Sequence, residues 1–458
     1  MATICVNQKS CDALALEALP PRSDTALSSD PPRGFPLLEK WNQPRINVYR
    51  TIATFWSFLV MGANDAAYGA LIPYLESYYH LSYTIVSLVF LSPLVGYTVA
   101  AFLNHRIHYT LGQRGVAIIG PACHLIAYVI NCIHPPYPVL VVAFAFAGLG
   151  NGLEDAAWNA WIGNMANANE VLGVLHGIYG AGAVMSPLIA TSMIAKGGLP
   201  WYYFYYVMVS EGSSQIFDPE LISQIGCAVV ELVVSGTCFW KSTAADFRAS
   251  NIPSVENNKG GLRDALFQRP AARVTWLCAL FLLGYVGVEV ALGGWIVTFM
   301  IQVRQGSAFA SGMTATGFWL GITVGRVILG FVTPRVGEKV AISVYIVCSM
   351  GFALILWLVP QFYASAVAVS LQGFFLGPLF PGAIVMVTKL LPQHLHVTSI
   401  GFVAAFGGSG AAILPFAVGV LAQAKGVKVL QPFIIALSGA ILVTWLVLPR
   451  VSKIRHNE

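Results

Sequence analysis

The sequence predicts an all-α integral membrane protein with twelve transmembrane helices, arranged as two six-helix bundles. Of its 458 residues, 57% are hydrophobic and only 10% are charged, and the mean hydropathy is +0.70. Soluble domains carry about 25% charged residues, so this chain cannot keep its surface in water. The net charge of +5 is too small to indicate a nucleic acid or another polyanion as a partner. The partner that the composition indicates is the lipid bilayer.

A helix needs about 20 mostly apolar residues to span a bilayer. Runs of this kind are rich in Gly, Ala, Leu and Phe and do not alternate with a period of two, which favours helices over a β-barrel. We predict spans at 50–75, 82–103, 115–133, 137–161, 172–195, 201–240, 274–300, 308–332, 340–359, 363–389, 397–422 and 429–449.

The distribution of positive charge predicts that both termini are cytosolic. In this orientation only four Lys or Arg residues lie in outer segments: Lys196, Arg304, Lys425 and Lys428. The remaining 21 lie in the tails and inner loops, where an excess of positive charge is expected.

The segments outside the spans complete the predicted organisation. Residues 1–48 are polar, lack the apolar core of a cleavable signal peptide, and are expected to form a disordered cytosolic tail. Residues 49–240 form the N-terminal bundle and 274–449 the C-terminal bundle. A basic cytosolic loop at 241–273 joins them, and 450–458 form a second cytosolic tail.

The sixth span is interrupted. Residues 209–224 contain three acids and no helical apolar face, whereas the flanking pieces would join into a span of ordinary length. One hypothesis is an insert encoded by a retained intron. The alternative is an extracytoplasmic loop within a broken helix.

The two halves resemble each other. The pattern GxGxxxxP occurs at 180–187 and again at 408–415, an offset of 228 residues. Six spans repeated in the same direction predict a parallel repeat, the arrangement of two-bundle transporters with a solute site between the halves. Packing glycines recur in membrane helices in general, but several matches at nearly one offset favour a repeat.

Three predicted spans carry carboxyl groups near their centres. These are Asp65, the neighbours Glu154 and Asp155, and Glu289. Because an ionisable group at the bilayer centre costs about 2.5–3.5 kcal/mol, each is a candidate for proton coupling, with a buried structural network as the alternative. Two adjacent carboxyls in a cavity of low dielectric would hardly both ionise, so one of them could load and release a proton.

Other polar and aromatic side chains are candidates for lining a solute cavity. On the fourth span, Asn151, Trp158 and Asn159 share the helical spacing of the two acids and are expected on one face with them. The full set of cavity candidates is Asn64, Tyr68, Asn151, Trp158, Asn159, Tyr179, Trp295 and Gln372. Because no Lys or Arg is expected at the centre of a span, neutral or cationic solutes are favoured over anions.

Other motifs are missing from the sequence. It holds no Walker lysine motif, no HExxH, no GxSxG and no cluster with zinc-ligand spacing. We therefore expect neither an enzyme nor an ATP-driven pump, no metal, and no cofactor beyond a proton gradient. The cysteines are expected to be reduced packing residues.

The chain resembles the major facilitator superfamily over residues 48–450. Arginine-glycine patterns after the second and eighth spans resemble the signature loop of that superfamily, and they give four candidate gating residues: Arg106, Arg114, Arg326 and Arg335. The first-half copy lacks the usual Asp-Arg pair.

More narrowly, the chain is similar to the fucose/glucose–proton symporter branch and its fungal relatives. The likeness is carried by GANDAAYG at 62–69, GLGNGLEDAAWN at 148–159, HGIYGAGAVMSPL at 176–188 and GVEVALGGW at 287–295. The resemblance implies that proton coupling falls on Asp65 and on Glu154 or Asp155.

The sequence thus predicts a secondary transporter that moves a small neutral solute with protons, and the resemblance implies that the solute is sugar-like. The alternatives are export of a fungal secondary metabolite or toxic compound, and a non-transporting sensor. A drug-antiporter signature in the fifth span is matched only in part. We expect a monomer in the plasma membrane or an internal membrane.

Overall fold

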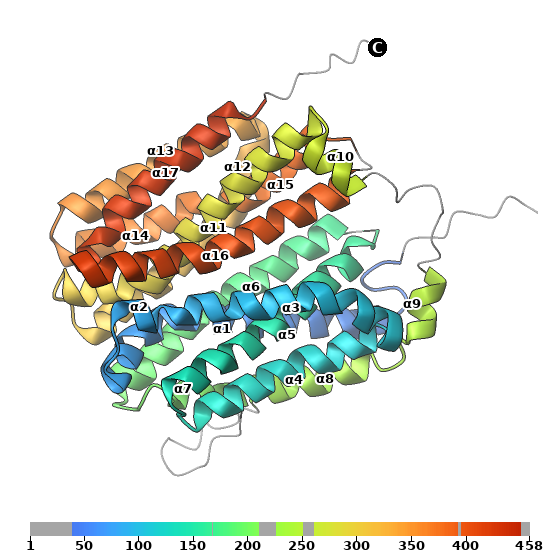
Figure 1. The fold of residues 1–458 in the computed structure, drawn as a ribbon, viewed down its shortest axis with the longest axis horizontal. Coiled ribbons are helices and arrows are strands. Elements are labelled where there is room, and N and C mark those ends of the chain that lie inside the picture. The colour runs from blue at the N-terminus through green and yellow to red at the C-terminus, as the bar shows by residue number, and fades with distance from the viewer. Residues whose placement is uncertain (1–38, 167, 210–225, 251–260, 393–394, 450–458) are drawn as a thin grey trace, which may run out of the picture. The chain divides into compact units, whose positions relative to one another are not determined.

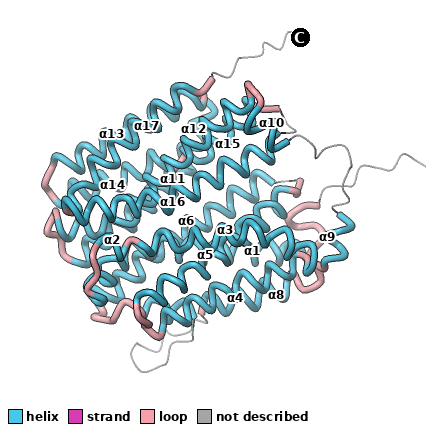
Figure 2. Tube along the Cα trace, in the orientation of Figure 1, coloured by secondary structure: helices cyan, strands magenta, loops and turns pink. Residues whose placement is uncertain are grey.

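A computed structural model describes residues 39–166, 168–209, 226–250, 261–392 and 395–449. Within these ranges the chain is helical, with loops and one isolated bridge between Lys40 and Gln43 (Figures 1 and 2). The possible insert at 209–224 lies outside the described residues from 210 onward, as does the tail at 450–458.

The N-terminal half begins with a long helix and ends with two short helices. Its elements are α1 (Ile46–Tyr79), α2 (Tyr83–Val86), α3 (Leu88–Leu111), α4 (Gln113–Cys132), α5 (Tyr137–Gly163), α6 (Ala168–Thr191) with its π-helical end Ser192–Lys196, α7 (Tyr203–Val209) and α8 (Cys227–Cys238).

Two short helices, α9 (Ala244–Ser250) and α10 (Gly261–Phe267), lie between the halves in the sequence. The C-terminal half then follows as α11 (Ala271–Gln302), α12 (Ala308–Val336), α13 (Glu338–Leu358), α14 (Phe362–Leu376), α15 (Leu379–Leu390), α16 (His396–Lys425) and α17 (Leu430–Val447).

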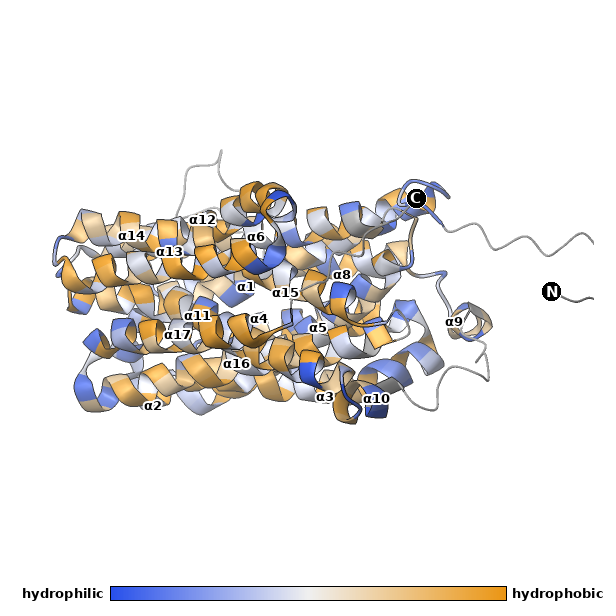
Figure 3. Cartoon of the chain, turned by 90° about the horizontal axis from the view of Figure 1, so that it is seen from above, coloured by the Kyte–Doolittle hydropathy of each residue, from blue (hydrophilic) through white to orange (hydrophobic). Residues whose placement is uncertain are grey.

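Ten helices in the described ranges are long and apolar enough to cross a membrane. Hydrophobic residues dominate along these helices (Figure 3). Helix α1, which carries Asn64 and Asp65, and the short helices α7 and α8 are not among the ten. The chain is therefore a multi-pass membrane protein.

The repeat seen in the sequence has a structural counterpart. A Cβ added to Gly182 of α6 would lie 2.1 Å from the carbonyl oxygen of Leu59 in α1. A Cβ added to Gly410 of α16 would lie 2.0 Å from the carbonyl oxygen of Leu283 in α11. Equivalent glycines thus let the equivalent helix pairs α1–α6 and α11–α16 pack at backbone distance.

Contacts between the halves gather at the end of the helices remote from the chain termini. A Cβ on Gly69 of α1 would lie 1.9 Å from the carbonyl oxygen of Gly293 in α11, and one on Gly312 of α12 would overlap Thr191 of α6. The amide of Tyr83 also donates a 2.9 Å hydrogen bond to Oε1 of Gln423. The two halves therefore close on each other at this end.

The structure corrects one expectation outside the spans and adds detail to another. The segment 39–48 is ordered, because Asn47 donates a 2.8 Å hydrogen bond to Glu39 Oε2 and the amide of Ala166 donates one to the Glu39 carbonyl. The connecting segment 241–273 contains α9, α10 and the start of α11. Helix α9 is held against α3 by Arg248, which donates a 3.0 Å hydrogen bond to the Tyr109 carbonyl.

Candidate functional site

Asp65 lies at the centre of a hydrogen-bond network that joins three helices of the N-terminal half. Its Oδ1 accepts hydrogen bonds from Nδ2 of Asn151 at 2.9 Å and Nδ2 of Asn64 at 3.1 Å. Its Oδ2 accepts one from the Tyr179 hydroxyl at 2.9 Å. The three donors come from α1, α5 and α6 and fix the position of the carboxyl group. A change in its charge therefore changes hydrogen bonds to all three helices.

Tyr179 and Tyr68 support this network from two sides. A Cβ on Gly62 of α1 would lie 2.0 Å from the Tyr179 carbonyl oxygen, so a glycine is required for α6 to bring Tyr179 within reach of Asp65. The Tyr68 hydroxyl accepts a 2.9 Å hydrogen bond from Asn64. Four residues predicted from the sequence, Asn64, Asp65, Asn151 and Tyr179, thus meet at one place.

The polar residues of α5 divide between several sets of partners. Asp155 accepts a 2.8 Å hydrogen bond at Oδ1 from Asn159, whose own Oδ1 lies 3.2 Å from His176 Nε2 on α6. Trp158 is fully buried and stacks on Phe239, with ring centroids 4.5 Å apart. The helical spacing is broad enough that Asp155 and Asn159 face α6 while Trp158 packs in the bundle core.

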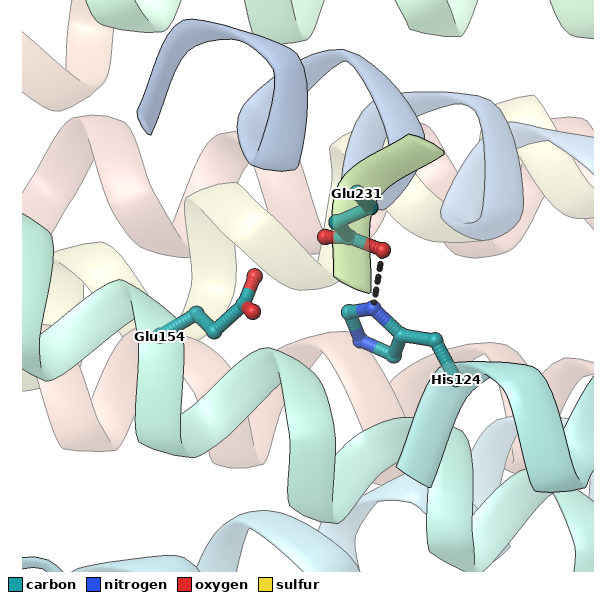
Figure 4. Close-up of side chains that lie close together, drawn as sticks. All are labelled: His124, Glu154 and Glu231. Carbon is teal, nitrogen blue, oxygen red and sulfur yellow. Dashed lines mark hydrogen bonds and ion pairs between the residues drawn. The ribbon is translucent and has the colours of Figure 1, made fainter. Parts of the chain in front are cut away.

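Glu154 belongs to a second cluster of titratable side chains. It lies with His124 of α4 and Glu231 of α8, and all three side chains are fully buried (Figure 4). His124 Nδ1 is 3.0 Å from Glu231 Oε2. One imidazole nitrogen and one oxygen from each carboxyl group lie within 4.8 Å of one another. We call these three residues the buried triad.

Two glycines make room for the buried triad. A Cβ on Gly120 would lie 2.7 Å from Oε1 of Glu154, and a Cβ on Gly150 would lie 2.6 Å from Nε2 of His124. An imidazole and two carboxylates at this spacing could share protons or surround a cation. The hydrogen bond between His124 and Glu231 already pairs two of the donor atoms with each other.

The sequence prediction missed His124 and Glu231. Glu231 is the one acid in the apolar stretch CAVVELVV, and His124 lies in an otherwise apolar run of α4. A charged or titratable residue in such a run is itself the signal that could have identified both.

A third polar contact lies in the C-terminal half. Arg326 Nη2 of α12 lies 3.4 Å from Glu289 Oε1 of α11, and Arg326 Nε donates to the Gly377 carbonyl at 3.2 Å. Arg326 lies about one turn from the middle of α12 and not in the loop that follows it. The sequence already placed Arg326 within the eighth span, and its role as a gating residue stays a prediction.

The other predicted residues have separate surroundings. Trp295 is fully buried and donates a 2.9 Å hydrogen bond to the Pro415 carbonyl, and Gln372 is fully buried in α14. Arg114 donates to the Leu111 carbonyl at the turn between α3 and α4. Arg106 and Arg335 are exposed near the ends of α3 and α12.

Comparison with known proteins identifies the family to which the sequence is similar. The sequence model described as Major Facilitator Superfamily matches residues 54–210 and 277–458. Among curated proteins, the chain is 29% identical to "Bypass of stop codon protein 6" of Saccharomyces cerevisiae, over 89% of this chain and 84% of that protein. It is 25% identical to the "Glucose/mannose transporter GlcP" of Bacillus subtilis, over 62% and 65% of the two chains.

A solved structure with the same fold is that of the E. coli fucose:proton symporter FucP. The TM-score is 0.54 at 14% sequence identity, and the match covers 87% of this chain and 98% of that one.

Proposed function

The chain belongs to the Major Facilitator Superfamily, and from that premise we propose that it moves a small neutral, sugar-like solute together with protons by alternating access. In this proposal α1 and the pair α7–α8 also cross the membrane, which gives twelve spans with both termini in the cytosol. Both the solute and the proton bind to residues of the N-terminal half.

The observation that carries the proposal is the environment of Asp65. This carboxyl accepts three hydrogen bonds from neutral donors on α1, α5 and α6. Protonation would remove its charge and turn one of its oxygens into a donor, so that Asn151 and Tyr179 would have to rearrange. A proton on Asp65 thereby alters the contacts between helices that must move for access to alternate.

A sugar-like solute suits the side chains around this carboxyl. The amides of Asn64 and Asn151 and the hydroxyls of Tyr68 and Tyr179 can donate and accept hydrogen bonds, as recognition of a polyhydroxylated ligand requires. The names of two similar proteins, a glucose/mannose transporter and a fucose:proton symporter, support the same class.

The packing of the halves supports alternating access. They close through Gly69 and Gly293 at the end remote from the termini. A solute path that opens there requires these two helices to separate, which a rocking motion between two pseudo-symmetric bundles provides.

The test is solute-driven proton flux in proteoliposomes that enclose a pH-sensitive dye. D-glucose, D-mannose and L-fucose are added outside, one at a time, to the wild type and to Asp65→Asn. We expect a sugar to acidify or alkalinise the lumen with the wild type and to produce no pH change with the variant.

Glu76→Gln is the matched control, because Glu76 is a carboxyl on the same helix outside the Asp65 network. It should keep the wild-type flux. Flux that persists in Asp65→Asn would overturn the role of this carboxyl. No flux with any sugar, from folded protein, would refute the sugar-proton proposal and favour export of a more apolar metabolite.

A further inference from the structure

We propose that the buried triad of His124, Glu154 and Glu231 is a single proton-binding site inside the N-terminal half. The inference rests on the proposed proton coupling and deepens it. The site holds the proton on a shared cluster of three helices, so that His124 and Glu231 are positioning residues for the proton that Glu154 carries.

The first support is geometric. The three side chains come from α4, α5 and α8, each is fully buried, and their donor atoms lie within 4.8 Å of one another (Figure 4). The carboxyl of Glu154 points toward the imidazole. Gly120 leaves room for the Glu154 side chain and Gly150 for the His124 side chain. No single helix could bring these groups together.

The second support is the set of unpaired polar atoms. Among the described residues, both carboxyl oxygens of Glu154, Oε1 of Glu231 and Nε2 of His124 are buried without a hydrogen-bond partner. A buried polar atom without a partner costs about 1–3 kcal/mol, and more when the group is charged. A proton placed between such atoms pairs two of them at once.

The third support is charge. The titratable groups that face the triad or its immediate neighbours are Asp65 on α1, Tyr97 on α3, Cys123 and Tyr128 on α4, Asp155 on α5, Tyr205 on α7 and Cys227 on α8. Each of these is neutral or negative. Two carboxylates in such surroundings need a positive partner, and bound protons can supply it.

A proton explains the geometry better than a metal cation does. His124 Nδ1 and Glu231 Oε2 are 3.0 Å apart in a direct hydrogen bond. That contact needs one proton between the two atoms, whereas a cation would require both atoms to turn toward it. Uptake of one proton converts a carboxylate to a carboxyl or the imidazole to an imidazolium, and release restores the original group.

Asn151 connects the buried triad to Asp65. It lies one helical turn before Glu154 on α5, and its Nδ2 donates to Asp65 Oδ1 at 2.9 Å. Its Oδ1 is buried and unpaired, as are both carboxyl oxygens of Glu154. A change of protonation at the triad can therefore alter the donors available to Asp65, at the place where we propose that the solute binds.

Infrared difference spectroscopy of the purified full chain in nanodiscs tests this inference without any solute. The carbonyl stretch of protonated carboxyl groups is followed as pH is changed, and the band lost in Glu154→Gln is assigned to Glu154. We expect the midpoint of its titration to move by about one pH unit or more in Glu231→Gln and in His124→Gln, as expected for coupled sites.

Thr237→Val is the matched control on α8, because the exposed Thr237 hydroxyl donates only within its own helix, to the Val233 carbonyl, and it should leave the midpoint unchanged. A second measurement is a pH titration of the wild type by ¹⁵N-histidine NMR, in which the signal of His124 is assigned by its loss in His124→Gln. In ¹⁵N-histidine NMR, the His124 signal should change at the same pH as the Glu154 band.

Three results would overturn the inference: no titrating band that belongs to Glu154, midpoints unaffected by both neighbours, or stoichiometric metal in the purified protein that is lost in His124→Gln. The outcome is separable from that of the proposed function. A coupled triad in a protein that shows no sugar-driven proton flux would leave the site in place and refute sugar–proton symport.

Discussion

The hydroxyl of Tyr179 lies 2.9 Å from Oδ2 of Asp65, and this hydrogen bond joins α6 to α1. The same two helices pack at backbone distance through Gly62 and Gly182. A short polar contact therefore lies between two helices whose relative position is otherwise fixed by glycine packing. A change in the charge of Asp65 therefore alters the strength of its hydrogen bond to Tyr179 and so its interaction with α6.

Removal of this hydroxyl should weaken proton coupling without unfolding the protein. In Tyr179→Phe, Asp65 loses one of its three donors, and a hydrogen bond to a charged group contributes about 1.5–3 kcal/mol. We expect solute-driven proton flux to fall by roughly tenfold or more, measured with the dye-loaded proteoliposomes. Tyr206→Phe, an exposed tyrosine on α7, should behave as the wild type. Equal loss in both variants would contradict a specific role for Tyr179.

The ion pair between Arg326 and Glu289 should show energetic coupling. Their side chains are 24% and 11% exposed, so each loses much of its hydration and depends on the other. Arg326→Met leaves Glu289 unpaired and should lower the melting temperature in detergent more than the double variant Arg326→Met/Glu289→Gln does. We expect a coupling of about 0.5–3 kcal/mol from the double-mutant cycle. Strictly additive effects would mean that the two charges do not interact.

The sequence was sufficient for the helical membrane fold because hydropathy and helix length are local properties. The predicted spans overlap the observed helices, and the Asp65 network consists of residues that were all candidates. The GxGxxxxP repeat also identified Gly182 and Gly410, which occupy equivalent helix contacts. These features depend on spacing along one helix or on composition, both of which are readable from the chain.

The buried triad and the ion pair depend on how helices rotate against one another, which spacing alone does not give. Glu154 and Asp155 are neighbours in sequence, yet Glu154 faces α4 and α8 while Asp155 bonds to Asn159. The motif around Arg326 likewise does not indicate that its side chain pairs with Glu289 of α11. In both cases the deciding information is the partner on another helix.

The start of helix α9 should fray at acid pH. The amide and hydroxyl of Thr243 donate to Oδ2 of Asp246 at 2.8 and 2.9 Å, and these hydrogen bonds hold the pKa of Asp246 below its usual value. The carboxylate therefore stabilises the start of α9 at neutral pH. This stabilisation is lost as the pH falls through the lowered pKa.

Hydrogen exchange of the α9 amides measures this effect. Exchange corrected for its intrinsic pH dependence should increase in acid in the wild type. In Asp246→Ala it should already be several-fold faster at neutral pH and should no longer respond to acid, because an N-terminal cap is missing. Lys241→Ala, an exposed change just before the helix, serves as control. A pH response that survives in Asp246→Ala would assign the effect to another group.

Gly69→Ala should shift the protein away from the state in which the two halves touch. In this state a Cβ at position 69 would lie 1.9 Å from the Gly293 carbonyl oxygen and 3.2 Å from Gly294 Cα, both backbone atoms that cannot turn aside. The state open at that end has no such clash, so its population should rise. A change of about 1.4 kcal/mol between the two states corresponds to a tenfold shift.

Thiol labelling of a Ser87→Cys reporter measures the shift, because Ser87 is fully buried beside Gly419 where the halves meet. We expect labelling to become about tenfold faster when Gly69→Ala is added. Gly408→Ala is the matched control, since a Cβ there meets nothing within 4 Å and should leave the labelling rate unchanged. Folded Gly69→Ala protein that labels at the control rate would mean that contact between α1 and α11 does not limit opening. The gate at this end would then lie in the contacts of α6 with α12.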